Sequence, residues 1–244
     1  MSMSVPAAIG TVPDVVRSGT GVATLTTWRV GTPERQREAV AAVTAAWRDR
    51  PWPDEGLAGY AVLVGEDGDT LRHYVRWSDE AAPAYYRDSA AAGRAARTAE
   101  VDAAVPGIER LGGGTYVPHL SLGPAPGAPE PGCVVLVEVE FDGPDPGRAR
   151  EWIAAVEDAL RTTPVPAPGG VSAHFHVSPD GRRVLNLAEW ESARAHRAAL
   201  AAPGEGVGSP TPQWRRVRRV HGSPGVAGST VTRYAPGVVL VPGA

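Results

Sequence analysis

Hydrophobic and polar residues alternate along short segments of the chain, a pattern typical of β-strands that bury one face. Other segments carry apolar residues at helical spacing, such as Val40, Val43 and Trp47. The elements predicted in the first half are a strand over 22–30, a helix over 34–48, a hairpin of 57–64 and 71–77 around Asp67-Gly68, a helix from Ser78, and a strand over 114–122. After an irregular arm, residues 1–19, the chain therefore begins with one β-α-β-β-α-β unit.

The same order of elements recurs after residues 123–132, a stretch rich in Pro and Gly that we interpret as a linker. The elements predicted in the second half are a strand over 134–141, a helix over 146–161, a hairpin of 171–177 and 182–190 around Ser178-Pro179-Asp180-Gly181, a helix from Glu191, and a strand over 229–234. The halves also match at an offset of 113 residues, which carries Trp77 onto Trp190. The same offset pairs Gly68 with Gly181, Asp67 with Asp180, Gly56 with Gly169, Pro51 with Pro164 and Pro53 with Pro166.

These matches predict an α+β fold of two tandem ferredoxin-like repeats, residues 20–122 and 133–244. Each repeat would form an antiparallel sheet with helices on one face, so the other face needs a cover. The sister repeat is the obvious cover. We therefore expect the repeats to pair within one chain into a pseudo-dimeric β-barrel, with further homo-oligomers left open.

Composition narrows the function classes. The net charge of −3 gives no reason to expect nucleic acid as a partner, and no apolar run approaches the roughly 18 residues that span a bilayer. The first residues show no secretory signal, so we expect a cytoplasmic protein without membrane partners. A single cysteine, Cys133, excludes an internal disulfide and a cysteine metal cluster, and the absence of lysine excludes Schiff-base chemistry.

The stretch from Val184 to His196 contains the only asparagine of the chain, Asn186. On a strand, Asn186 and Trp190 point to the same side. If Ser178-Pro179-Asp180-Gly181 is a tight turn, even-numbered residues of both hairpin strands share that side, which would add His174 and His176. Buried polar side chains cost about 1–3 kcal/mol each unless they are satisfied, so this face is a candidate cavity lining.

The first repeat differs at the corresponding positions. His73 replaces the asparagine, Trp77 is kept, and Tyr60 is predicted on the opposite face. In the second repeat, His174 and His176 have the i, i+2 spacing of metal ligands on a strand, but no third ligand is evident, so no metal site is predicted.

The segments Gly169–His176, Asp180-Gly181 and Val184–Ser192 resemble the antibiotic biosynthesis monooxygenases, and within them the cofactor-independent anthrone oxygenases of aromatic polyketide pathways. The resemblance implies that Asn186, Trp190 and His176 line a substrate cavity. That family has a proton-handling tyrosine six residues after the tryptophan, where this chain has His196. A cavity arginine of a later helix has its nearest counterpart in Arg215, with Arg216, Arg218 and Arg219 as alternatives.

The resemblance implies a monooxygenase that oxidises a polycyclic aromatic polyketide intermediate with dioxygen and without a cofactor. The residues expected to act in catalysis are Asn186, Trp190, His176 and His196; those expected to bind substrate are His174, Arg215, Trp77 and His73. Two alternatives stay open: a polyketide cyclase, and a non-catalytic protein that binds haem or a pathway intermediate.

Overall fold

The structure is a computed structural model of the 244-residue chain and describes residues 6–17, 21–48, 50–53, 55–124, 126–162, 168–202 and 211–243. Pro164 and Pro166 of the repeat match, and residues 1–5 and 18–19 of the arm, lie outside the described residues. The chain divides into two compact units, residues 1–118 with 234–244, and residues 119–233.

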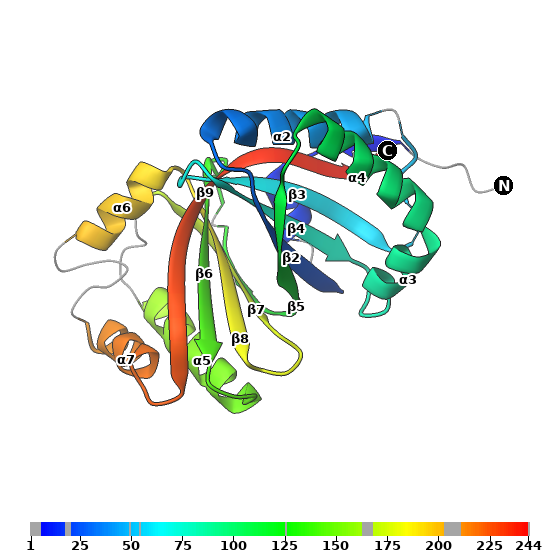
Figure 1. Cartoon of the computed structure of the whole chain (residues 1–244). Coiled ribbons are helices and arrows are strands. Elements are labelled where there is room, and N and C mark those ends of the chain that lie inside the picture. Colours follow the sequence, from blue (N-terminus) through cyan, green and yellow to red (C-terminus); the bar gives the residue numbers. More distant parts are fainter. Residues whose placement is uncertain are drawn as a thin grey trace. The chain divides into compact units, whose positions relative to one another are not determined.

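The first unit is an antiparallel sheet with helices α2, α3 and α4 on one face and the short helix α1 against the other (Figure 1). Its elements are β1 (Ala7–Ile9), α1 (Val12–Val16), β2 (Val22–Arg29), α2 (Pro33–Trp47), β3 (Leu57–Gly65), β4 (Thr70–Trp77), α3 (Ala82–Ser89), α4 (Ala91–Ala104), most of β5 (Glu109–Leu122) and the end of β9 (Val226–Pro242). The strand order is β1-β9-β3-β4-β2-β5. Thr32 is the N-cap of α2, since its hydroxyl accepts a hydrogen bond from the Arg35 N–H. The following Pro33 has no backbone N–H that would need an acceptor. Helix α4 packs beside α2.

The second unit repeats this plan. Its elements are β6 (Cys133–Phe141), α5 (Pro146–Thr162), β7 (Gly170–Val177), β8 (Arg183–Trp190), α6 (Ala193–Ala201) and α7 (Pro212–His221), with the remaining ends of β5 and β9. Strand β8 lies between β6 and β7 and is antiparallel to both. Helices α5 and α7 pack against each other.

The predicted α+β class and the two tandem repeats are confirmed. The 113-residue offset carries β4 onto β8 end to end, and Pro33 at the start of α2 onto Pro146 at the start of α5. Gly68 and Gly181 occupy the same hairpin position with φ of +72° and +71°, a conformation that glycine adopts without steric cost. The arm is less irregular than expected, because it contains β1 and α1.

Each unit has its own apolar core between its sheet and its helices. In the first unit this core includes Val43, Trp47 and Val62. In the second, Trp152 and Ile153 of α5 pack onto Phe141 and Phe175 of the strands. Large aromatic side chains bury much apolar area, so these contacts fix how α5 covers the sheet that carries Asn186.

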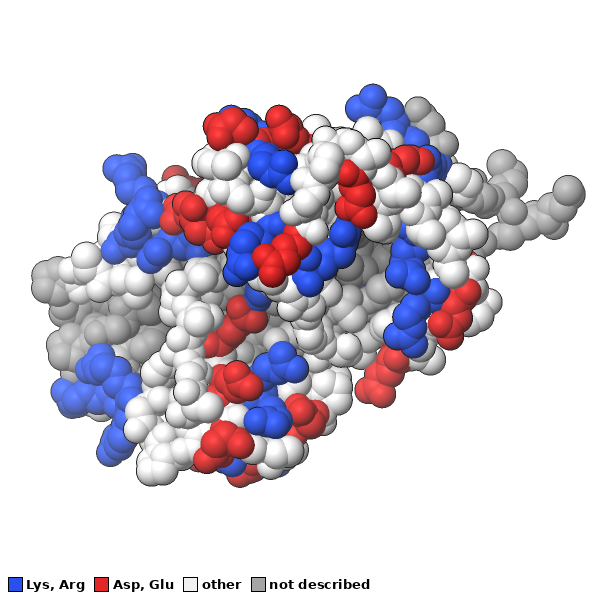
Figure 2. Space-filling model, viewed as in Figure 1, with Lys and Arg blue, Asp and Glu red and all other residues white. Residues whose placement is uncertain are grey.

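Basic and acidic side chains are mixed over the face of the molecule in Figure 2. Exposed ion pairs such as Arg29–Glu109 and Arg110–Asp102 join some of them. Pairs of this kind contribute little to stability in water, so we assign them no large role. Within the described residues, no helix is long and apolar enough to cross a membrane.

Candidate functional site

The β7–β8 hairpin has a different register from the one expected. Ser178 and Arg183 form a backbone pair, so four residues connect the strands, and Phe175 lies opposite Asn186. Directly opposite residues of an antiparallel pair share a face, so Ala173 and Phe175 accompany Asn186. The prediction that His174 and His176 share this face is wrong, because the observed pairs join odd-numbered residues of β7 to even-numbered residues of β8.

Beneath the helices of the second unit lies a cavity of about 590 Å³, a size typical of small-molecule sites. Its wall is mainly apolar. The strands contribute Val135, Ala173, Asn186, Ala188 and Trp190, and the helices contribute Trp152, Val156, His196, Leu200, Trp214 and His221. Of the residues predicted to be functional, the structure therefore brings Asn186, Trp190 and His196 together around one space.

Asn186 is a polar residue in this apolar wall. Its side chain is 8% exposed, and the buried Oδ1 has no hydrogen-bond partner among the described residues. A buried amide oxygen without a hydrogen-bond partner costs about 1–3 kcal/mol relative to an apolar group of similar shape. The amide is therefore better suited to a ligand in the cavity than to packing.

His196 lies at the same wall, in edge contact with Trp190 at 4.8 Å between ring centroids. Arg233 of β9 also lines the cavity, and its Nε–H donates to His196 Nδ1 at 2.9 Å. A nitrogen that accepts a hydrogen bond carries no hydrogen, so the neutral imidazole holds its hydrogen on Nε2. Arg233 thus presents His196 as a hydrogen-bond donor.

None of the four arginines considered on α7 lines the cavity. Trp214, Val217 and His221 recur at helical spacing and face inward, which leaves Arg215, Arg216, Arg218 and Arg219 on the other side of the helix. Trp214 is 5% exposed, and its indole N–H has no partner among the described residues. The indole is a buried donor at the cavity, and no motif or spacing in the sequence pointed to it.

His174 and His176 lie on the opposite face of β7, where hydrogen bonds occupy them. His174 contacts the hydroxyls of Ser172 and Ser121, both at 2.9 Å, and Ser172 donates to the buried Glu189. His176 Nδ1 is 3.1 Å from the His174 carbonyl oxygen, to which it donates. In the part of the chain that the structure describes, no three His, Cys, Asp or Glu side chains gather as metal ligands.

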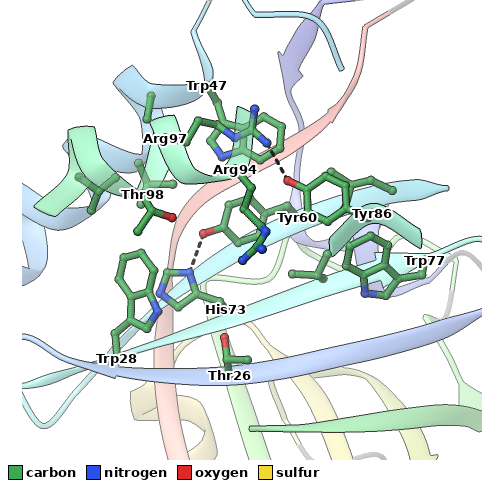
Figure 3. Close-up of a pocket in the computed structure, with 15 residues that line it drawn as sticks. Thr26, Trp28, Trp47, Tyr60, His73, Trp77, Tyr86, Arg94, Arg97 and Thr98 are labelled. Carbon is green, nitrogen blue, oxygen red and sulfur yellow. Dashed lines mark hydrogen bonds between the residues drawn. The ribbon is translucent and has the colours of Figure 1, made fainter. Parts of the chain in front are cut away.

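The first unit has a smaller cavity of about 190 Å³, drawn in Figure 3. It contains the other two predicted residues, His73 and Trp77, so these lie in a site of their own within the first unit. Tyr60 lies on the same face as His73 because it pairs with Val75 across the hairpin, which corrects the predicted face. The Tyr60 hydroxyl is 2.6 Å from His73 Nδ1.

His73 should make stability depend on pH. Burial, with a smaller effect of the Arg110 charge, lowers the pKa of His73 from 6.5 to about 3, so the folded protein keeps this histidine neutral where the unfolded chain takes up a proton. The contribution of neutral His73 to the unfolding free energy is complete above pH 6.5 and is lost as the pH falls towards 3. At pH 5 the loss is about 2 kcal/mol. Unfolding free energies at pH 7 and pH 5 should therefore differ less for His73→Gln than for the wild type.

The matched control for this prediction is His119→Gln, which changes an exposed histidine. It should leave the pH dependence of the wild type in place. Equal pH dependence of His73→Gln and the wild type would contradict the buried neutral state of His73.

The fold and the cavity together define a class: an α+β protein of ferredoxin-like repeats with a small-molecule cavity between sheet and helices. Residues 134–204, within the second repeat, match the model of the family described as "Antibiotic biosynthesis monooxygenase". This confirms the resemblance noted in the sequence.

The relatives agree with this family. Tetracenomycin-F1 monooxygenase of Streptomyces glaucescens is 40% identical over 78 residues, which are 31% of this chain and 66% of that protein. An anthrone oxidase-like protein of known crystal structure is similar in fold, with a TM-score of 0.63, 15% identity and coverage of 98% of both chains. The crystal structure of a putative monooxygenase from Lactobacillus acidophilus NCFM is also similar in fold, with a TM-score of 0.56 and 12% identity. The match covers 91% of this chain and 98% of that protein. At these identities the two structures show the fold alone.

Proposed function

We propose that the cavity of the second unit oxidises a polycyclic aromatic polyketide intermediate, an anthrone-like phenol, with dioxygen and without flavin or metal. The observation that carries the proposal is the buried Asn186 amide in the wall of an otherwise mainly apolar cavity. This segment lies within the family match, and a relative of the same region is named a tetracenomycin-F1 monooxygenase.

The cavity suits a flat aromatic ring system. Trp152, Trp190 and Trp214 supply planar apolar surface, and the volume of about 590 Å³ exceeds what a single ring needs. Asn186, His196 and Trp214 are among the groups of the wall that can bind polar atoms of such a ligand. We assign Asn186 to the ketone oxygen of the substrate, where its amide N–H stabilises the negative charge of the enolate, as an oxyanion hole does.

The oxidation by dioxygen requires no group beyond these side chains. Loss of a proton from the reacting CH₂ gives an enolate, which passes one electron to dioxygen. The substrate radical and superoxide then combine in a C–O bond. His196 Nε2–H, held in place by Arg233, passes a proton to the resulting peroxide and regains one from water, which also takes up the proton of the CH₂ group. Loss of the second C–H proton then breaks the O–O bond, so the CH₂ group and O₂ become a ketone and water.

The test is oxygen uptake by the purified full chain with a simple anthrone, after dialysis against a chelator. One O₂ should disappear for each quinone formed, well above the rate in buffer, and ¹⁸O₂ should place one ¹⁸O in each quinone. Uptake equal to buffer would exclude this activity for anthrones. Conversion of a poly-β-ketone without oxygen uptake would instead support the cyclase alternative.

The residues are proposed to act within one unit of a cytoplasmic protein. The cavity residues used here all belong to residues 119–233. The mechanism therefore requires no residue of the first unit, and variants of the two cavities can be compared directly.

A further inference from the structure

We propose that the first unit holds a second ligand site, which binds a single-ring aromatic anion such as a benzoate in the cavity bounded by β2, β3, β4, α2 and α4. The family match covers residues 134–204 and assigns nothing here. The inference does not depend on the oxygenase activity proposed for the second unit.

The size of the cavity limits the ligand to about one ring. Its volume is about 190 Å³, and an apolar protein cavity of about 150 Å³ is enough to take up benzene. The cavity of the second unit, about 590 Å³, is roughly three times larger. The two units therefore differ in the size of ligand they can accept.

The walls are aromatic on several sides. Trp28, Trp47, Trp77 and Tyr86 line the cavity, and Trp28 also packs against His73 at 3.9 Å between ring centroids. Figure 3 shows these rings arranged around the same space. Flat walls of this kind favour a planar ring by stacked and edge contacts.

A buried donor faces this ligand space. Burial raises the pKa of Tyr60, so the phenol keeps its hydrogen and donates it to His73 Nδ1. His73 Nε2 then carries the imidazole hydrogen. This nitrogen is buried, His73 is 3% exposed, and Nε2 has no hydrogen-bond partner among the described residues. A ligand oxygen would satisfy it.

The charge at the cavity is positive. Arg94 and Arg97 of α4 both line it, and neither forms an ion pair with a carboxylate in the described part of the chain. Arg97 lies over the Trp47 ring at 4.2 Å and donates to the Tyr86 hydroxyl at 2.7 Å. Among the described residues, the Arg94 guanidinium donates only one hydrogen bond, a long one of 3.4 Å to the Arg87 carbonyl. Figure 3 shows its guanidinium between His73 and Trp77, where it can meet an anionic oxygen.

The experiment is a ¹⁹F NMR titration of the full chain with 4-fluorobenzoate, compared with 4-fluorobenzyl alcohol and 4-fluorobenzylamine. Saturable binding of the benzoate is expected, with the alcohol weaker and the amine without measurable binding. Arg94→Gln and His73→Phe should each weaken benzoate binding, the first by about tenfold, because a charge-assisted hydrogen bond is lost. Arg94 is exposed, so its replacement should leave the fold intact.

The matched control is Arg87→Gln, an exposed arginine of α3 that does not line the cavity, and its benzoate affinity should equal that of the wild type. Three results would each overturn the proposal. The first is that benzoate shows no saturable binding up to about 10 mM, a binding free energy weaker than about −3 kcal/mol. The second is that the amine and the benzoate bind equally. The third is that both Arg94→Gln and His73→Phe keep the affinity of the wild type.

Discussion

Asn186→Leu should lower kcat/KM for oxidation of an anthrone about 10²–10³-fold, the loss typical of removing one oxyanion donor. Leucine has the same number and branching of side-chain heavy atoms and takes the same place in the wall, but it cannot donate to the ketone oxygen. Since Asn186 Oδ1 has no partner among the described residues, the leucine variant should also be at least as stable as the wild type. Oxygen-electrode kinetics and thermal unfolding measure the two effects.

Activity and stability measured on the same variant distinguish a functional role of Asn186 from a structural one. If Asn186 were only structural, the Asn186→Leu variant would be less stable than the wild type, and its folded fraction would keep the activity. This is the reverse of the expected result. Asn186→Ala should repeat the loss of activity without the gain in stability. If His73→Ala abolished oxidation while both Asn186 variants kept it, the chemistry would have to be assigned to the first unit.

The order of the elements could be predicted because its signals are local. Turn residues such as Gly68 and Gly181 sit where the chain needs a positive φ, and their regular offset exposes the repeat without knowledge of any contact. The limits of β4 and β8 followed from their apolar alternation. Most of the predicted elements therefore agree with the structure to within a few residues, but β5 begins earlier than expected, β9 begins earlier and ends later, and β1 and α1 were not predicted.

The face of β7 could not be predicted because it depends on the number of residues in one loop. Pairing of Ser178 with Arg183 places Ala173 and Phe175 beside Asn186 and turns His174 to the other side. The alternation of the sequence is compatible with either register. Asn186, Trp190 and His196 line one cavity because they follow each other on one strand and the next helix, and their roles stay a prediction.

Arg233 was missed for a different reason. It lies 37 residues after His196 on a strand that pairs with distant parts of the chain, so no sequence spacing connects the two. The exposed arginines of α7 offered a more visible signal, although helical geometry directs them away from the cavity. A long-range contact of this kind becomes visible only in the folded chain.

Arg233→Met should lower kcat for anthrone oxidation about 10²-fold, at the lower end of what a positioned proton donor contributes. Methionine keeps the apolar part of the side chain but removes the donor at 2.9 Å from His196 Nδ1. The imidazole is then fixed neither in its tautomer nor in its orientation, so Nε2–H rarely meets the peroxide. The peroxide should accumulate in single-turnover experiments followed by mass spectrometry.

The control is Arg216→Met, which changes an exposed arginine of α7 outside the cavity wall and should leave kcat unchanged. Arg233→Gln keeps an amide donor and should recover part of the lost rate, whereas His196→Phe should be as slow as Arg233→Met. The double variant should then be no slower than either single variant, because both substitutions interrupt the same proton transfer. Additive losses in the double variant would show that Arg233 acts on the substrate independently of His196, and the assignment of Arg233 as a positioning residue would be wrong.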